Sequence, residues 1–236
     1  FAVYSDEGNE ERLIPFDTIP RVFSAKEWDL LERGCVQRTK ALNAFLTDIY
    51  GKQDIIKAGK IPADLVLENP AFEKAMIGVQ PPGGVWSHIC GVDVVRTGPN
   101  EFFVLEDNCR TPSGVSYMIE AREVMMQMFP RLFAGGAVRS VEDYPDLLAQ
   151  AMTDVAPPNC EGRPTLAILT PGSFNSAYYE HSFLSDRMGI ELVEGQDLFC
   201  EGGKVWMRTI RGPEKVDVIY RRIDDAFLDP EVFNPD

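Results

Sequence analysis

Apolar residues recur at helical spacing in the first part of the chain. Ser24 followed by Glu27 is the pattern of a capping box at a helix start, and Gly51 stands where a glycine often follows a helix end. The spacing predicts one long amphipathic helix between Ser24 and Gly51, with its apolar stripe in the core. That stripe consists of Trp28, Leu31, Cys35, Leu42, Phe45, Leu46 and Ile49.

The next part of the chain changes to shorter elements. Segment 52–84 is punctuated by proline and glycine, which predicts short helices and loops. Residues 88–96 and 102–107 are rich in β-forming side chains, and the turn residues 97–101 lie between them. This pattern predicts an antiparallel hairpin.

Two helices are predicted after a loop at residues 109–114. The first covers about residues 115–129 and the second about residues 141–155. We expect the buried side of the first helix to carry Met118, Ile119, Met125 and Met126.

The pattern changes again after the proline-containing linker 156–159. Residues 165–170 form a continuous apolar strand, followed by a turn and a helix over residues 175–188. Strand, helix and strand at this spacing predict an open α/β sheet. The further strands are expected at 190–194, at 205–208 after a hairpin turn, and at 216–220.

Composition narrows the possible partners. The chain has 236 residues and a formal net charge of −14 at pH 7, which argues against binding to nucleic acid or to anionic lipid. No apolar run is long enough to span a membrane, and the first residues lack the pattern of a signal peptide. The five cysteines include no CxxC pair, so we expect reduced thiols and a cytoplasmic protein. A phosphate ligand would need a divalent cation beside so acidic a chain.

The sequence contains no Walker A, GxGxxG, HExxH or GxSxG motif. The candidate chemical groups are therefore sought on the hairpin. If the turn is centred between Pro99 and Asn100, Asp93 lies directly opposite Glu106, and Asn108 shares the face of Glu106. Two acids in that position repel each other unless a cation lies between them. Two carboxylates and an amide oxygen suit magnesium held together with substrate phosphates.

Two alternatives stay open for this acid pair. Both acids can be solvated on an exposed face of the hairpin, and a slip of one residue in the register would separate them. A two-carboxylate hydrolase of the glycosidase type is the other alternative, which a test of metal dependence distinguishes.

The same residues resemble a known family. Asp93, Glu106 and Asn108, followed by Pro112 and Gly114, resemble the metal-binding hairpin of the ATP-grasp ligases. The longer string GVDVVRTGPNEFFVLEDNCRTPSGVSYMIEAR is similar to the circularly permuted branch, often labelled glutathionylspermidine synthase-like. The resemblance extends to FDTIPRVFSAKEWDLLERG, ALNAFLTDIYG, LTPGSFNSAYYEHSFL and VDVIYRRIDDAFLDP. It implies an ATP-dependent carboxylate–amine ligase that acts through an acylphosphate.

The resemblance also implies an order of domains and a fold class, α/β (α+β). We expect residues 1–158 to form an ATP-grasp-type lobe, with helices packed on the antiparallel hairpin that binds magnesium. Residues 159–236 would form a Rossmann-like pre-ATP-grasp α/β unit. In this circular permutation the nucleotide-gripping lobe would follow, so we expect a truncated chain that lacks it.

Roles follow from the resemblance, with ATP and Mg²⁺ as the cofactors. Asp93, Glu106 and Asn108 would hold the magnesium ions. The family often has an arginine two residues before the Asp, where this chain has Gly91. Arg110 is therefore expected to bind the phosphate or the tetrahedral oxyanion, with a surface ion pair as the alternative.

The remaining candidates are groups that would bind substrate or phosphate. The start of a helix favours binding of an anion, and a plain N-cap is the alternative interpretation. The carboxyl end of a strand in an open α/β sheet favours binding of a ligand, and a simple turn is the alternative there. Glu180 and His181 on the next helix can face the same cleft, or His181 can be a packed helix residue. The candidates are Ser113 and Gly114 at the helix start, Gly172, Ser173 and Asn175 after the strand, and Arg221.

The expected partners are ATP and a small-molecule or peptide carboxylate and amine, with no nucleic acid and no membrane. The alternative function is an inactive ATP-grasp pseudo-enzyme that serves as a scaffold in a peptide-modification system. The sequence indicates neither the acid, the amine nor the oligomeric state.

Overall fold

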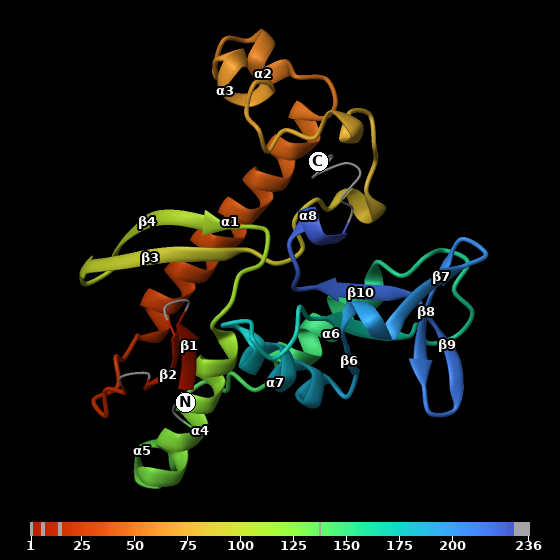
Figure 1. Cartoon of the computed structure of the whole chain (residues 1–236). Helices are drawn as coiled ribbons and strands as arrows, with labels where there is room; N and C mark the ends of the chain where they lie inside the picture. The colour runs from red at the N-terminus through yellow and green to blue at the C-terminus, as the bar shows by residue number, and fades with distance from the viewer. Residues whose placement is uncertain (1, 6–7, 14–15, 137, 229–236) are drawn as a thin grey trace. The chain divides into compact units, whose positions relative to one another are not determined.

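The computed structural model describes residues 2–5, 8–13, 16–136 and 138–228 (Figure 1). The chain packs as two compact units, one made of residues 21–112 and the other of residues 1–20 with 113–236. Helices and small sheets occur in the chain together, so the predicted mixed α/β class is confirmed. The predicted domain border between residues 158 and 159 divides the chain differently from these packing units, and it stays a prediction.

The unit of residues 21–112 is organised by the long helix α1 (Ala25–Ile49). The predicted capping box is present: the Ser24 hydroxyl accepts from the Glu27 amide at 3.3 Å, and the Glu27 carboxylate accepts from the Ser24 amide at 3.0 Å. Gly51 follows the helix end as predicted, but its φ is not positive. A Cβ at Gly51 would lie 2.7 Å from the carbonyl oxygen of Thr47, so close packing explains the glycine.

The apolar stripe of α1 is only partly in the core. Its carboxyl end is buried, where Ile49 and Tyr50 pack with Val66. Trp28 at the other end is 42% exposed and contacts Phe23 edge-on, so the prediction of a fully buried stripe is wrong there. The buried cluster lies where the following short elements fold back on the helix.

Short helices and one hairpin complete this unit, as predicted. The helices are α2 (Asp54–Lys57) and α3 (Ala63–Leu67), followed by 3₁₀ turns at Lys74–Met76 and Pro82–Gly84. The antiparallel hairpin consists of β3 (Gly91–Gly98) and β4 (Glu101–Asn108) and crosses α1 (Figure 1).

The other unit contains a three-stranded parallel sheet of order β10–β5–β6. These strands are β5 (Leu166–Leu169), β6 (Glu191–Val193) and β10 (Val218–Arg221). All four residues of β5 are buried, which explains their continuous apolar run. Helix α7 (Tyr178–Met188) connects β5 to β6, so the predicted open α/β arrangement is confirmed.

Further helices belong to this unit. They are α4 (Val115–Met128), α5 (Pro130–Phe133), α6 (Tyr144–Asp154) and α8 (Asp225–Leu228). Ile119 and Met125 lie on the buried side of α4 as expected, but Met118 and Met126 are exposed. Each is one residue from a buried position, about 100° around the helix. The buried face of α4 is therefore narrower than expected. Within the described residues, no helix combines the length and apolarity needed to cross a bilayer.

Two strand groups differ from the prediction. Strands β7 (Leu198–Glu201) and β8 (Lys204–Thr209) form the predicted hairpin, and β9 (Gly212–Val216) adds to it. The sequence GPEKV gives β9 little strand propensity, and its pairing with β8 compensates. Strands β1 (Ala2–Ser5) and β2 (Gly8–Leu13) form an antiparallel pair that was not predicted.

Candidate functional site

The predicted acid pair is present in the ladder of the hairpin. Asp93 on β3 and Glu106 on β4 are Cα partners, and the next pair but one is Gly91 with Asn108. Side chains of directly opposed residues lie on one face, with Cβ atoms about 5 Å apart. The amide nitrogen of Asn108 donates to Glu106 Oε1 at 3.4 Å, so these two side chains share that face. All three predicted ligands are exposed.

A register shift directly follows the acid pair. Val94 pairs with Val104, so Leu105 is the extra residue of β4, and the uninterrupted register expected from the sequence is wrong in the middle of the hairpin. Strict alternation from Phe102 would place Glu106 on the same side as Phe102. The shift reverses the alternation, so that Phe102 and Val104 line a groove against α1 while Glu106 faces away from that helix.

Asp107 confirms this alternation from the other side of the strand. Nε of Arg38 on α1 donates to Asp107 Oδ1 at 2.7 Å and to Oδ2 at 2.8 Å, and Arg38 Nη2 lies 2.6 Å from Oδ2. These hydrogen bonds lower the pKa of Asp107. The carboxylate of Asp107 is therefore committed to α1, and its neighbours Glu106 and Asn108 are held on the open face.

The donor atoms of the open face fit magnesium. Two carboxylates and one amide oxygen form an all-oxygen set, which hard cations prefer. Within the described residues, no group of three or more His, Cys, Asp or Glu side chains is placed to hold a metal ion. The hairpin offers two such side chains, so substrate oxygens and water would complete the coordination, as is usual for magnesium.

The residues next to these ligands explain why position 91 is a glycine, where the family that the hairpin resembles often has an arginine. A Cβ at Gly91 would lie 2.9 Å from Cβ of Pro112 and 3.5 Å from Cβ of Asn108. No side chain fits there without a shift of the neighbours, so the arginine common in the family has no room. Arg110 is exposed on the loop two residues after Asn108.

A second candidate region lies in the other unit, at the carboxyl end of β5. Because β6 flanks β5 on one side and β10 flanks it on the other, the connections diverge there, which is where open α/β sheets bind ligands. An open cavity of about 450 Å³ occupies this edge. It is lined by Thr170, Pro171, Glu194, Gly195, Gln196, Ile223 and Phe227.

The predicted substrate residues after β5 lie in this turn. Gly172 has a φ of 106°, and a Cβ there would lie 3.3 Å from Oε1 of Glu194, a residue of the cavity. Ser173 is exposed. Asn175 Oδ1 accepts from the Ala177 amide at 2.9 Å, so its side chain shapes the turn before α7.

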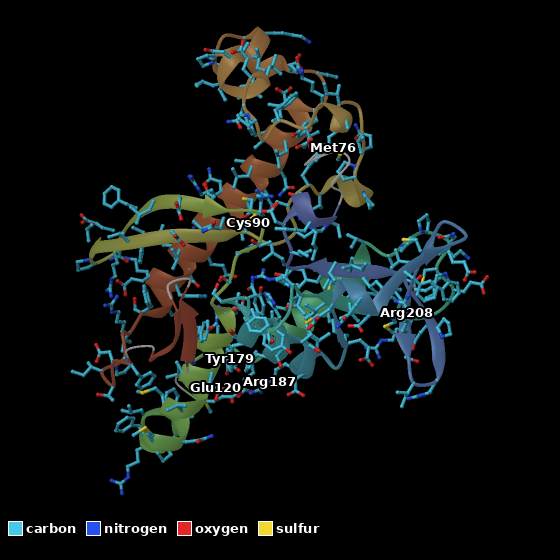
Figure 2. The ribbon with its side chains drawn as sticks, in the orientation of Figure 1. Met76, Cys90, Glu120, Tyr179, Arg187 and Arg208 are labelled. Atoms are coloured by element: carbon cyan, nitrogen blue, oxygen red, sulfur yellow. The ribbon has the colours of Figure 1, made fainter. Side chains whose placement is uncertain are left out.

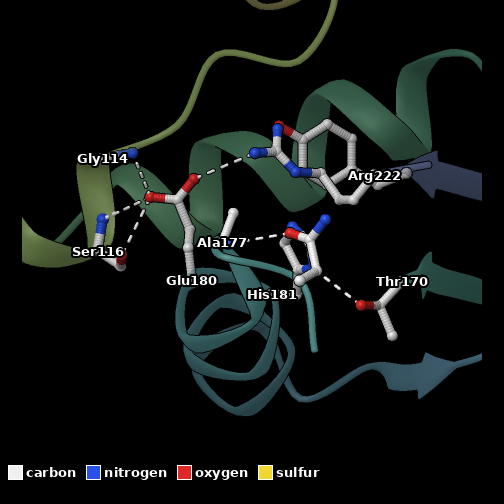
Figure 3. Close-up of polar contacts among 9 residues, drawn as sticks. Gly114, Ser116, Thr170, Ala177, Glu180, His181 and Arg222 are labelled. Carbon is white, nitrogen blue, oxygen red and sulfur yellow. Dashed lines mark hydrogen bonds and ion pairs between the residues drawn. The ribbon is translucent and has the colours of Figure 1, made fainter. Parts of the chain in front are cut away.

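Glu180 of α7 occupies the start of helix α4 (Figure 3). Its Oε2 atom accepts from the amides of Gly114 at 2.6 Å and Ser116 at 3.2 Å, and from the Ser116 hydroxyl at 3.0 Å. The anion at this helix start is therefore the chain's own carboxylate. A phosphate-binding role for Ser113 and Gly114 stays a prediction, and it would require the Gly114 amide to leave Glu180.

The other oxygen of Glu180 faces a buried arginine. Arg222 Nη2 lies 3.5 Å from Glu180 Oε1 (Figure 3). Arg222 Nη1 donates to the Tyr220 hydroxyl at 3.2 Å. Burial raises the pKa of the nearby Tyr144 to about 12, with Tyr220 and Glu180 adding to the shift. Arg221, the arginine predicted to meet substrate, pairs with Asp225 and donates to the carbonyl of Ile223 at 2.9 Å.

His181 is a packed helix residue, as one of the two alternatives expected. It is 1% exposed, and its Nδ1 lies 2.8 Å from the hydroxyl of Thr170 (Figure 3). Thr170 Oγ1 also accepts from the Gly172 amide at 3.2 Å. Burial, with the charge of Arg222 adding, lowers the pKa of His181 to about 4. Sequence reasoning missed Thr170, whose only signal was a polar residue at the end of an apolar strand. Of the two arginines that follow the strand at 216–220, one was expected to face a substrate carboxylate and the other solvent, and the structure buries Arg222 against Glu180.

Comparison with known proteins supports one family. A family model described as circularly permuted ATP-grasp type 2 matches residues 20–236. An uncharacterized protein of Synechocystis sp. is 52% identical over 236 residues, which is 100% of this chain and 49% of that protein. An uncharacterized protein of Mycobacterium tuberculosis is 53% identical over 227 residues, 96% of this chain and 41% of that protein.

A third relative, from Frankia casuarinae, is named "Putative glutamate--cysteine ligase 2-2". It is 38% identical over 219 residues, 92% of this chain and 25% of that protein. The chain thus spans half or less of the length of these relatives. The match to the family model covers nearly every residue, including both candidate regions, and the chain belongs to the circularly permuted ATP-grasp type 2 family.

Proposed function

We propose that the full-length protein is an ATP-dependent ligase that joins a carboxylate to an amine through an acylphosphate. Membership of the family supports this class of reaction. The name of the Frankia relative concerns glutamate and cysteine, which supply a carboxylate and an amine. The single observation that carries the proposal is the pairing of Asp93 with Glu106 on an open face of the hairpin.

A bound cation gives a physical reason for placing two acids opposite each other, because opposed carboxylates destabilise a two-stranded ladder. Among the residues that the structure describes, neither Asp93 nor Glu106 forms an ion pair with a basic side chain, whereas Asp107, next to Glu106 on β4, has one with Arg38. We assign Asp93, Glu106 and Asn108 as magnesium ligands. Bound magnesium would neutralise charge on the phosphate oxygens of ATP.

The protein residues around the ligands have positioning roles in this proposal. The bonds between Arg38 and Asp107 fix β4 against α1, so Glu106 needs little rearrangement to bind a cation. Arg110, two residues beyond Asn108, is proposed to bind the transferred phosphate or the oxyanion with its planar guanidinium.

The cavity at the carboxyl end of β5 is proposed to take part of a substrate. Gly172 and Ser173 lie in the turn beside it, and Glu194 supplies a carboxylate to its wall. Asn175 is proposed to support this region by shaping the turn before α7. Arg221 is proposed to support it through its ion pair with Asp225. A glutathionylspermidine synthase-like choice of acid and amine stays a prediction.

The test is magnesium-dependent binding of a non-hydrolysable ATP analogue to the full-length protein. Asp93→Asn and Glu106→Gln remove one charge each and keep the side-chain shape. We expect each to weaken binding by about 10–100-fold, the range seen when groups around a metal are altered. Glu106→Gln should also lower kcat by about 10²–10³-fold, as loss of an electrostatic group does.

Glu101→Gln is the matched control, because Glu101 is an exposed acid of the same hairpin that contacts Thr97 at its turn end. It should bind the nucleotide as the unchanged protein does. If all three variants bind magnesium and nucleotide as tightly as the unchanged protein, the metal site lies elsewhere and the proposal fails.

A further inference from the structure

Two cysteines lie against each other at the base of the hairpin. Cys90 directly precedes β3 and Cys109 directly follows β4, so both adjoin the last pair of the ladder, Gly91–Asn108 (Figure 2). Their Sγ atoms are 3.9 Å apart, and both are free thiols. Within the described part of the chain, the other cysteines, Cys35, Cys160 and Cys200, have no second cysteine beside them in this way.

The surroundings hold the two thiols in this position. The Ser87 hydroxyl is buried, lies 3.2 Å from Cys90 Sγ, and donates to the carbonyl of Cys109 at 3.4 Å. Ser87 thus contacts the chain on both sides of the hairpin base. Cys90 and Cys109 are both half-buried, so a small oxidant can reach them from solvent.

The backbone places the pair within range of a covalent bond. Opposed residues of an antiparallel ladder have Cα atoms about 4.5–5.5 Å apart, and disulfides join cysteines whose Cα atoms are about 4.4–6.8 Å apart. Closing the gap between the sulfurs to about 2.05 Å therefore needs side-chain rotation and little movement of the strands.

We propose that Cys90 and Cys109 are a redox modification site that forms a reversible disulfide with a peroxide. One thiol attacks a peroxide oxygen, the O–O bond breaks, and a sulfenic acid and one water result. The other thiol attacks the sulfenic sulfur, the S–S bond forms, and the second water leaves. Together the two thiols lose two protons and two electrons, and these reduce hydrogen peroxide to two waters.

The disulfide would link the two ends of the hairpin next to Asn108, which is one of the residues assigned to magnesium. Disulfides in a reducing compartment are usually transient and redox-sensing. Formation of this bond depends on the cysteine geometry alone, so it can be tested separately from the proposed ligase activity.

Peptide mapping of the full-length protein after treatment with hydrogen peroxide tests the proposal. Trypsin separates the two cysteines, because it cuts after Arg96 and Arg110 and so releases residues 75–96 and 97–110. We expect these two peptides to be recovered as one species, lighter by two hydrogens than their sum. Dithiothreitol should return both peptides separately.

Variants make the result specific. Cys109→Ser should stop the reaction at a sulfenic acid on Cys90, which dimedone traps, whereas the control Cys35→Ser should still give the joined peptides. Recovery of both peptides with free thiols after peroxide, or their joining to other cysteines, would overturn the proposal. The main result, joined or separate peptides, is measured in the unchanged protein. Misfolding of a variant therefore can neither produce nor hide it.

Discussion

A single extra residue in β4 decides which side chains of the hairpin reach solvent. Leu105 shifts the pairing after Asp93, so Asp107 turns toward Arg38 while Glu106 and Asn108 turn the other way. The sequence predicted the pair Asp93–Glu106 correctly because counting from the turn holds at both ends of the hairpin. It did not predict the shift, because a bulge depends on how Phe102 and Val104 pack beside α1.

His181 gives a pH prediction at the same scale. Its pKa is about 4 in the folded protein against 6.5 in the unfolded chain, so the unfolded chain takes up the proton first as the pH falls. This contribution to stability is complete above pH 6.5 and is lost as the pH falls toward 4. Between pH 7 and pH 5 we expect the unchanged protein to lose about 2 kcal/mol more than His181→Gln.

Urea unfolding at the two pH values measures that difference in the free energy of unfolding. His88→Gln is the control, because His88 is exposed, and it should behave as the unchanged protein does. Equal losses in the unchanged protein and in His181→Gln would show that burial of the imidazole is not what makes the stability depend on pH.

At the scale of elements, Glu180 joins three parts of one unit. It belongs to α7, accepts hydrogen bonds at the start of α4, and faces Arg222 directly after β10. Glu180→Gln removes the charge but keeps the shape, and so removes the negative charge that faces the buried guanidinium of Arg222. We expect the free energy of unfolding to fall by about 3–5 kcal/mol, as for other broken buried pairs.

Glu123→Gln provides the comparison for that variant. Glu123 lies 2.7 Å from Arg187 in a much more exposed pair of the same unit. Its loss should lower the free energy of unfolding by less than about 1 kcal/mol in the same denaturant titration. Similar effects of the two substitutions would mean that Glu180 does not hold these elements together.

At the scale of the whole molecule, the prediction concerns coupled turnover. A ligase releases ADP and phosphate in step with amide formation, because the acylphosphate forms on the acid and is consumed by the amine. With a panel of carboxylates and amines, we expect the full-length protein to release phosphate at least about tenfold faster when both classes are present. A coupled phosphate assay and detection of the amide measure this.

The Asp93→Asn, Glu106→Gln double variant should show no such coupled release. Steady ATP hydrolysis that no carboxylate changes would contradict ligase chemistry. Tight magnesium–nucleotide binding without turnover for any acid and amine would instead favour the inactive scaffold as the function.

The sequence by itself determined those elements that depend on interactions between residues close together in the chain. The capping box of Ser24 and Glu27 defines the start of α1, Pro99 and Asn100 form the turn of the hairpin, and the apolar run of β5 marks a buried strand. These features were enough to predict the acid pair on the hairpin and the candidate region at the carboxyl end of β5. Such features need only neighbours along the chain or directly across a turn.

Only the tertiary structure decided the contacts between segments far apart in sequence. Glu180 fills the helix start where a phosphate was expected, β9 exists because β8 offers it a partner, and Cys90 meets Cys109 at the hairpin base. Each depends on the balance between the loss of solvation on burial and the new partner gained. That balance is settled by packing in three dimensions, which no local pattern of residues contains.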